Sequence, residues 1–247
     1  MKISVITVCY NSVATIRDTI KSVLEQDYSN IEYIIIDGGS KDGTLEIINE
    51  YKNKIAKIIS EPDKGIYDAM NKGIYVSTGD YVGTLNSDDI FSHSKVLSDV
   101  ARLLENTEFD AVYGDLILVD RENTSKIVRR FPSKYFKKWK IRFGFMLPHP
   151  TFYARRNLFD ELGYYKLNYR VSADFELITR FLKRGITTTR ISDVMVKMRQ
   201  GGISSNGFWW RIHQNFEIVR ACKENGIYTN IFLILFKIPA KLLSYIK

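Results

Sequence analysis

The N-terminal part of the chain repeats one pattern four times: a short apolar run, rich in β-branched residues, is followed by a stretch with helical periodicity. The runs are ISVITVCY (3–10), IEYIIID (31–37), IAKIIS (55–60) and GDYVGTLN (79–86). Strands that alternate with helices at this spacing are typical of βα units, in which consecutive strands lie parallel. The pattern therefore predicts an α/β fold, a mostly parallel, Rossmann-like central sheet flanked by helices.

Polar residues follow each of these predicted strands at its C-terminal end. They are Tyr10 and Asn11, Asp37, Glu61 and Asp63, and Ser87 to Asp89. In open parallel sheets, ligands bind beyond the carboxyl ends of the strands. We therefore expect these side chains to converge on one rim of the sheet and to form a binding site there.

Two adjacent carboxylates, Asp88 and Asp89, end the fourth run. They repel each other, and their burial beside a strand is costly. A hard dication such as Mg²⁺ or Mn²⁺ would offset this cost, because it takes carboxylate oxygens and completes its shell with substrate phosphates. An acidic helix N-terminus, favoured by the helix dipole, is the alternative, and the pair alone does not decide between them.

The second part of the chain has fewer clear repeats. DAVYGDLILV (110–119) predicts a strand with which KIVRRF (126–131) can pair, and TTTRISDVMVKM (187–198) predicts a returning strand. Between them, ADFELITRFLKRG (173–185) has the apolar spacing of an amphipathic helix.

Composition limits the class of protein. The chain has 247 residues, a net charge of +8 and only two cysteines, which predict one large domain, an anionic partner and a reducing compartment. The first apolar run is near the short limit for a signal peptide, and no run approaches the roughly 20 apolar residues of a membrane span. We therefore expect a cytoplasmic protein, either free or attached to the cytoplasmic face of the inner membrane.

Five segments, taken in order, resemble the family 2 glycosyltransferases with a GT-A fold, of the bacterial polysaccharide or glycan-assembly type. They are SVITVCYN, IEYIIIDGGSKDGT, EPDKGIYDAMNKG, GDYVGTLNSDD and SADFELITR, and the resemblance covers roughly the first 205 residues. It implies a nucleotide-sugar-binding half (1–110) and an acceptor-binding half (111–205) of one GT-A domain. A helical C-terminal extension (206–247) would follow.

This resemblance also implies the reaction. Such an enzyme binds a nucleotide diphosphate sugar, most commonly UDP-linked, through Mn²⁺ or Mg²⁺. It transfers the sugar, with inversion, to a hydroxyl of a saccharide or polyprenyl-linked acceptor. A nucleotidyltransferase is the competing enzyme class, but the loop CYNSVATIRD after the first strand lacks the glycine that such enzymes usually carry there.

The same resemblance implies roles for the rim residues. Asp89 would ligate the metal, and Asp88 would contact the ribose or phosphate. Asp37 would accept a hydrogen bond from the base, while Tyr10 would stack on it and Val8, with neighbouring backbone groups, would read its edge. Plain packing of Tyr10, and an Asp37 carboxylate that bonds its own loop, are the alternatives.

Sugar transfer needs a base that deprotonates the attacking hydroxyl. By resemblance this base is Asp174, at the start of the predicted helix 173–185. Glu176 is a second candidate, and a first-turn acid that only stabilises the helix dipole is the third interpretation. Ala173 stands where the family more often has another acid, which leaves the role of the neighbouring acid open.

Three further residues receive roles by resemblance. His149 would complete the metal shell or touch the diphosphate, unless it is a hydrogen-bonded structural residue. The segment RQGGISS (199–205) resembles a loop that closes over the donor, from which Arg199 or Ser204 would reach phosphate oxygens; a plain glycine turn is the alternative.

Basic and aromatic residues alternate between 126 and 142, and the C-terminal stretch IFLILFKIPAKLLSYIK (231–247) is apolar and cationic. Both features favour peripheral membrane contact. The basic stretch could instead be a solvated face or bind nucleic acid. A nucleic-acid-binding module would leave the acidic rim unexplained, so we expect no nucleic-acid partner. The C-terminus could instead pack on the enzyme itself or on a partner in a homo-oligomer.

Overall fold

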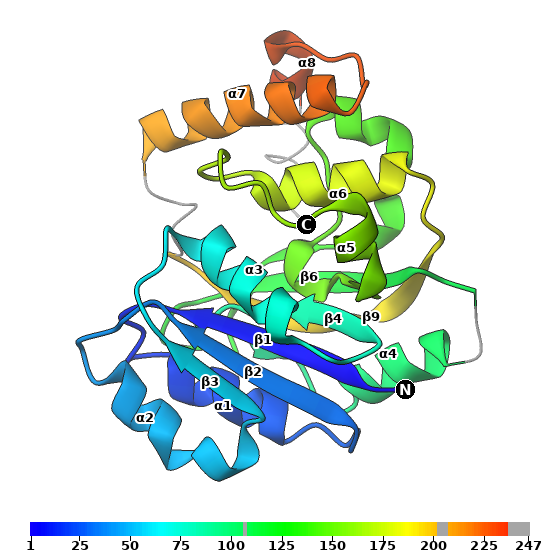
Figure 1. The fold of residues 1–247 in the computed structure, drawn as a ribbon. Helices are drawn as coiled ribbons and strands as arrows, with labels where there is room; N and C mark the ends of the chain where they lie inside the picture. Colours follow the sequence, from blue (N-terminus) through cyan, green and yellow to red (C-terminus); the bar gives the residue numbers. More distant parts are fainter. Residues whose placement is uncertain (106–107, 202–206, 237–247) are drawn as a thin grey trace.

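A computed structural model describes residues 1–105, 108–201 and 207–236 of the chain (Figure 1). Within these residues nine strands form one sheet in the order β3-β2-β1-β4-β8-β6-β9-β5, with β7 paired to β6. The strands are β1 (Ile3–Cys9), β2 (Ile31–Asp37), β3 (Lys57–Ser60), β4 (Tyr81–Thr84), β5 (Ile90–Phe91), β6 (Ala111–Val119), β7 (Ile127–Phe131), β8 (Tyr153–Arg155) and β9 (Thr188–Arg199).

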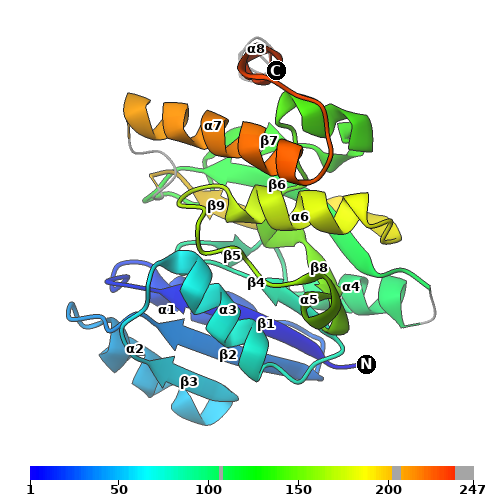
Figure 2. The same cartoon turned by 45° about the horizontal axis from the view of Figure 1, so that its top comes forward.

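Helices cover both faces of this sheet (Figure 2). The α-helices are α1 (Ile16–Leu24), α2 (Thr44–Glu50), α3 (Ile66–Val76), α4 (Val96–Leu104), α5 (Asn157–Leu162), α6 (Ala173–Lys183), α7 (Phe208–Glu224) and α8 (Ile231–Leu235). The 3₁₀ helices are η1 (Lys52–Lys54), η2 (Ser133–Tyr135), η3 (Lys138–Phe143) and η4 (His149–Thr151). The predicted α/β class is confirmed.

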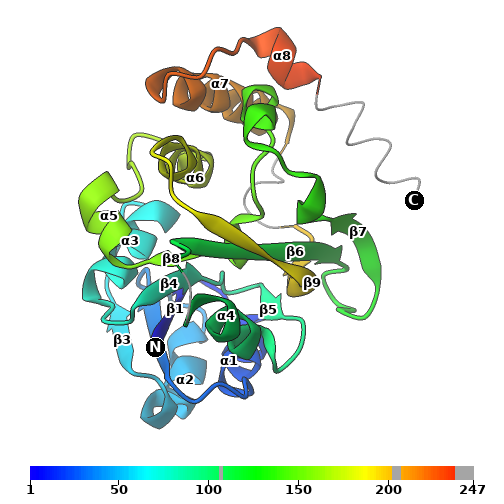
Figure 3. The same ribbon diagram turned by 90° about the vertical axis from the view of Figure 1, so that its right-hand side faces the viewer.

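Alternation along β1 explains the two helical layers. Ile6 and Val8 point to the face covered by α3 and α6, while Ile3 and Val5 point to the face covered by α1, α2 and α4. Both faces of β1 are buried, and even Ser4 and Thr7 are fully shielded from solvent, which is why this strand carries no charged side chain. Helix α7 lies on the far side of α6 from the sheet (Figure 3).

The strands β3, β2, β1 and β4 are parallel, as predicted. Their register pairs Cys9 with Asp37 and Asp37 with Ser60, so β1, β2 and β3 end at the same level. The strand β8 is antiparallel to β4 and joins it to β6. The same sheet therefore runs through both predicted halves, and the boundary proposed at residue 110 lies directly before β6.

The C-terminal extension is helical over α7 and α8, and residues 237–247 lie outside the described part. Ile218 and Cys222 of α7 and Ile234 of α8 are buried in the same core as α6. No helix among the described residues is long and apolar enough to cross a membrane. The described extension therefore packs on the enzyme through one face.

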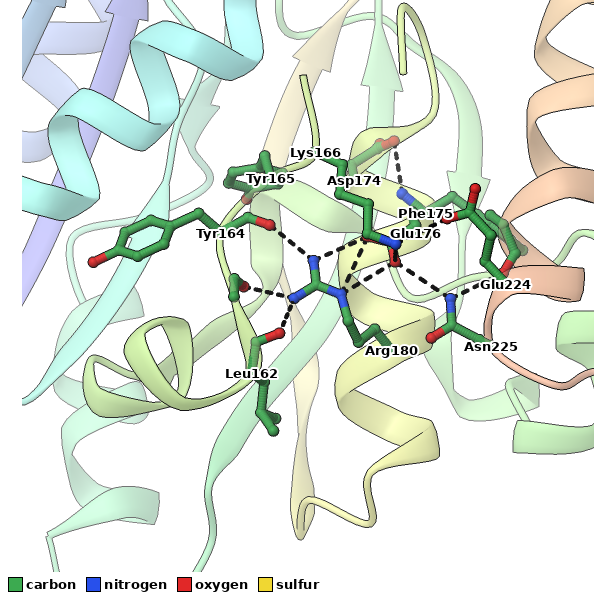
Figure 4. Close-up of polar contacts among 12 residues, drawn as sticks. Leu162, Tyr164, Tyr165, Lys166, Asp174, Phe175, Glu176, Arg180, Glu224 and Asn225 are labelled. Atoms are coloured by element: carbon green, nitrogen blue, oxygen red, sulfur yellow. Dashed lines mark hydrogen bonds and ion pairs between the residues drawn. The ribbon is translucent and has the colours of Figure 1, made fainter. Parts of the chain in front are cut away.

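A buried ionic cluster holds α6 in place (Figure 4). Glu176 is fully buried and lies 2.9 Å from both Arg180 Nη2 and Lys166 Nζ. The Arg180 guanidinium also donates to the carbonyl oxygens of Leu162, Gly163 and Tyr164. Because Arg180 binds both Glu176 and these three carbonyl oxygens, the cluster ties α6 to the turn after α5.

Removal of the Glu176 carboxylate should destabilise the protein. Burial alone raises the pKa of Glu176, but the hydrogen bonds from Arg180 and Lys166 outweigh burial and leave the pKa below its ordinary value of 4.5. We expect Glu176→Ala to lower the free energy of unfolding by about 3 kcal/mol, because the buried Arg180 loses its carboxylate partner and Lys166 loses one of its two. Urea unfolding at pH 7 measures this difference, with the exposed Glu46→Ala as the control.

The sign of the pH dependence follows from the lowered pKa. The contribution of Glu176 is complete above pH 4.5 and is lost as the pH falls through the lower, folded-state pKa. The difference in the free energy of unfolding between wild type and Glu176→Ala should therefore become smaller below pH 4.5. If wild type and Glu176→Ala unfolded at the same urea concentration at pH 7, the prediction would be contradicted.

Candidate functional site

The predicted convergence of the strand ends is confirmed. Ser12 Oγ, after β1, lies 2.8 Å from Ser87 Oγ, after β4. The backbone N–H of Asn11 donates to Ser40 Oγ, after β2, at 2.8 Å. These hydrogen bonds join three loops that are far apart in the sequence, so the polar residues beyond the strands share one rim.

At the β1–β2–β3 end of the rim, an aromatic ring is available to a ligand. Tyr10 is 64% exposed, so simple packing does not account for its ring. A Cβ atom on Gly38 would lie in ordinary contact with the Tyr10 ring, at 3.4 Å, but 2.5 Å from Asp63 Oδ2, so a larger residue there would require the Asp63 side chain to move. Val8 is buried in the core, which leaves only its backbone groups for contact with a ligand.

Asp37 bonds its own loop in this structure. Its carboxylate is buried and accepts hydrogen bonds from the backbone of Gly39 and Ser40 and from the hydroxyls of Ser40 and Ser60. Burial raises its pKa, but these donors outweigh burial and hold the pKa below its ordinary value. The structure thus shows the loop-bonding alternative, and base recognition by Asp37 would require it to exchange one of these donors.

The acidic pair lies beside a buried arginine. Arg199 Nη1 donates to the backbone oxygen of Asp88 at 3.1 Å, and Arg199 Nη2 lies 2.5 Å from Asp18 Oδ2. Arg199 is the last residue of β9 and is 6% exposed, so it does not belong to an open loop as predicted. The reason is β9, which extends to Arg199 and carries its side chain under the pair. Ser204 lies outside the described residues.

Asp88 and Asp89 differ in their surroundings. Asp88 is half-buried, whereas Asp89 is fully buried, with Oδ2 accepting from Asn86 Nδ2 at 3.0 Å and Oδ1 without a hydrogen-bond partner. Burial raises the pKa of both groups, and for Asp89 the neighbouring Asp88 raises it further. An orphaned buried carboxylate oxygen beside a second carboxylate is a site where a cation would be stabilising.

This arrangement fits a divalent cation whose ligands come partly from the protein and partly from a substrate. No group of three or more His, Cys, Asp or Glu side chains is placed to hold a metal in the part of the chain that the structure describes. Asp88 and Asp89 would hold Mn²⁺ or Mg²⁺, with oxygens of water and phosphate completing the shell. A closed structural metal site does not fit these residues.

A pocket opens beside Asn86, the hydrogen-bond partner of Asp89, between α3, α6 and α7. Its lining includes Tyr67, Met70, Asn86, His149, Asp174 and Trp210. Asp174 is half-buried, and its Oδ1 lies 3.3 Å from the Tyr67 hydroxyl. A carboxylate with access to a pocket and few donors of its own can accept a proton from a bound group.

The two acids at the start of α6 point in different directions (Figure 4). The Glu176 carboxylate points toward Arg180 and is bound within the buried cluster. The Asp174 carboxylate points away from that cluster and lines the pocket. The structure therefore separates the two candidates for a base, and Asp174 alone of the two reaches the pocket.

His149 takes a hydrogen-bonded position in the pocket wall. Its Nε2 lies 2.7 Å from the Tyr165 hydroxyl and 3.3 Å from Thr84 Oγ1. Burial lowers its pKa, while Asp174 acts in the opposite direction. The His149 ring therefore favours the neutral form. Its Nε2 is already hydrogen-bonded within the protein, as expected of a structural histidine.

Sequence reasoning missed several residues of this site, including Tyr67 and Met70 of α3 in the pocket wall. Asn86 belongs to the NSDD segment but received no role, although it bonds Asp89 and lines the pocket. Asp18 and Trp210 come from α1 and α7, and no local pattern connects either to the rim. Only the position of Asn86 directly after a strand could have pointed to it.

Comparison with known proteins identifies the family. Residues 4–165 match the family described as Glycosyl transferase family 2. A PGL/p-HBAD biosynthesis glycosyltransferase of Mycobacterium bovis is 31% identical over 208 residues, which cover 82% of this chain and 78% of the relative. An Escherichia coli protein named UDP-Glc:alpha-D-GlcNAc-diphosphoundecaprenol beta-1,3-glucosyltransferase WfaP is 29% identical over 218 residues, covering 86% and 84%.

Solved structures share the fold. S. aureus TarS 1–349 in complex with UDP matches with a TM-score of 0.71 at 20% identity, over 91% of this chain and 65% of that one. The mannosyltransferase PcManGT from Pyrobaculum calidifontis, in complex with GDP-Man and Mn²⁺, matches with a TM-score of 0.67 at 19% identity, over 90% and 63%. This chain thus spans less than two thirds of either structure. On the family match and the relatives together, the chain belongs to glycosyl transferase family 2 and is a glycosyltransferase.

Proposed function

We propose that this enzyme transfers a sugar, with inversion, from a nucleotide diphosphate sugar to an acceptor hydroxyl, with Asp174 as the base. The placement of the Asp174 carboxylate in a pocket that is also lined by Asn86, the hydrogen-bond partner of Asp89, carries the proposal. Relatives support the substrate class: WfaP is named for UDP-Glc, and TarS and PcManGT were solved with UDP-GlcNAc and GDP-Man.

The chain's own residues would divide the reaction between the rim and the pocket. An acceptor hydroxyl in the pocket would give its proton to Asp174 as its oxygen attacks the anomeric carbon. The bond from that carbon to the diphosphate would break on the opposite side, which inverts the centre. A divalent cation held by Asp88 and Asp89 would neutralise charge on the departing diphosphate.

Donor recognition would use the exposed end of the rim. The exposed Tyr10 ring would stack on the base, with backbone groups near Val8 at the base edge. Asp37 would accept from the ring N–H if it exchanges one donor of its loop. Asp88, the more accessible of the acidic pair, would face the ribose and phosphates, and we propose UDP as the nucleotide.

The acceptor would be a saccharide, or a polyprenyl-linked saccharide at the cytoplasmic face of a membrane. The name of WfaP, which contains diphosphoundecaprenol, supports this class. Exposed rings occur at Tyr135, Trp139, Phe232 and Phe236, at 61%, 62%, 74% and 66% exposure. Helix α8 contacts η3, in which Lys140 Nζ lies 5.7 Å from the centre of the Trp139 ring, so apolar and cationic groups occur together in this region.

Replacement of the proposed base should abolish transfer without loss of donor binding. We expect Asp174→Asn to lower the transfer rate at least about 100-fold, the effect of losing a general base. The enzyme is incubated with Mn²⁺ and a panel of nucleotide sugars, and the release of nucleoside diphosphate measures transfer. Calorimetry measures donor affinity. Asp160→Asn, an exposed acid on α5, is the control. Transfer by Asp174→Asn near the wild-type rate would place the base elsewhere.

Replacement of the acidic pair should remove the metal response. We expect Mn²⁺ with a bound donor to raise the melting temperature of the wild type but not of Asp89→Asn or Asp88→Asn. Without metal, Asp89→Asn should be at least as stable as the wild type, because a buried amide costs less than a buried, partly unpaired carboxylate. A wild type whose donor affinity is unchanged by Mn²⁺ and Mg²⁺ would refute the metal role.

Membrane contact can be tested with vesicles. We expect the protein to sediment with phosphatidylglycerol vesicles and much less with phosphatidylcholine vesicles. Lys138→Gln, at the exposed start of η3, should weaken binding about fivefold, since one lysine at an anionic surface contributes about 1 kcal/mol. The exposed Lys95→Gln on the loop before α4 is the matched control. Equal weakening by both variants would argue against this surface.

A further inference from the structure

The segment of residues 166–172, here called the approach segment, leads directly into α6 and to Asp174 two residues later. It has no regular secondary structure of its own, so its backbone amides need partners from elsewhere. It also lies beyond residues 4–165, the part of the chain that matches the family. What fixes this segment therefore decides where Asp174 lies.

One side chain of α7 binds three consecutive amides of the approach segment. Glu217 Oε1 accepts from the backbone N–H of Arg170 at 2.6 Å, and Oε2 accepts from those of Val171 and Ser172 at 2.9 Å each. Glu217 is 5% exposed, so these bonds are shielded from water. Hydrogen bonds to an ionised carboxylate are about twice as strong as neutral ones.

Other residues of α7 contact the same segment. The contacts are Trp210 with the Arg170 guanidinium, Arg220 with the Asn168 carbonyl and Tyr169 ring, and Glu224 with Lys166. Positions 210, 217, 220 and 224 are separated by seven, three and four residues, the spacing of one helix face. One whole face of α7 thus lies along the approach segment.

The opposite side of the segment is also held. The Tyr67 hydroxyl of α3 donates to the Val171 carbonyl at 2.6 Å and lies 3.3 Å from Asp174 Oδ1. Glu217 therefore binds the N–H of Val171 while Tyr67 binds its carbonyl. The backbone of Val171 is therefore fixed from both sides, three residues before Asp174.

We propose that Glu217 is a positioning residue for the transfer step: it orders the backbone at 170–172 and thereby places the Asp174 carboxylate against the acceptor hydroxyl. The inference rests on the proposed function, since it assumes that Asp174 is the base. A displacement of about 1 Å at a reacting group can cost 100-fold in rate. The helical extension thus has a role in the reaction besides any membrane contact.

The test compares two substitutions on the same face of α7. Glu217→Gln replaces one accepting oxygen by an NH₂ group that faces backbone donors, and we expect at least a tenfold lower kcat with an unchanged KM for the donor. Glu224→Gln removes an ion pair to Lys166 but leaves the amides of 170–172 bound, and its kcat should stay within twofold of wild type. Melting temperatures and donor affinities of both variants show that they are folded.

Hydrogen exchange gives a readout that needs no activity. The amides of residues 170–172 should exchange at least tenfold faster in Glu217→Gln than in wild type and Glu224→Gln. Faster exchange with an unchanged kcat would overturn the positioning role, and so would equal losses of kcat in both variants. A wild type that consumes no nucleotide sugar would instead refute the proposed function, while the exchange result would still report on the Glu217 contacts.

Discussion

The parallel register of β1 with β2 and β4 is the constraint on which the site depends. Because Cys9 of β1 lies opposite Asp37 of β2, and Ile6 of β1 lies opposite Thr84 at the end of β4, the loops that follow these strands leave the sheet at the same edge. Tyr10 and the acidic pair are brought to one rim by this register rather than by contacts among themselves. A slip of one residue would turn every side chain of a strand to the opposite face.

Within this frame, neighbours decide what each carboxylate can do. Glu176 and Asp174 are two residues apart on α6, yet one is surrounded by Arg180 and Lys166 and the other faces a pocket. Asp88 and Asp89 are adjacent, yet only Asp88 is accessible to solvent. The same chemical group is thus structural when its lone pairs are filled by donors, and available for chemistry when they are not.

The strand and helix pattern was predictable because it depends on local periodicity. The parallel sheet, the shared rim and the helix that begins near Asp174 all follow from apolar spacing and from the rule that parallel strands end together. The positions of Glu176 and Arg199 were not predictable. Burial of Glu176 depends on the turn at 162–164, and the place of Arg199 depends on how far β9 extends. The Glu176–Arg180 pair is local, at i,i+4, but the turn that Arg180 binds and the partner strand of β9 lie well outside the neighbouring sequence.

The sequence by itself determined the class of fold, the residues that follow the strands and the family resemblance, since each is written in short segments whose order is preserved. Only the tertiary structure decided which acid of α6 reaches the pocket, that Arg199 lies beneath the acidic pair and that Glu217 holds the approach segment. The physical reason is that these facts depend on contacts between residues far apart in the chain. Glu217 lies 47 positions from Arg170, and Arg199 lies 111 positions from Asp88. Such contacts exist only once the sheet has brought the elements together.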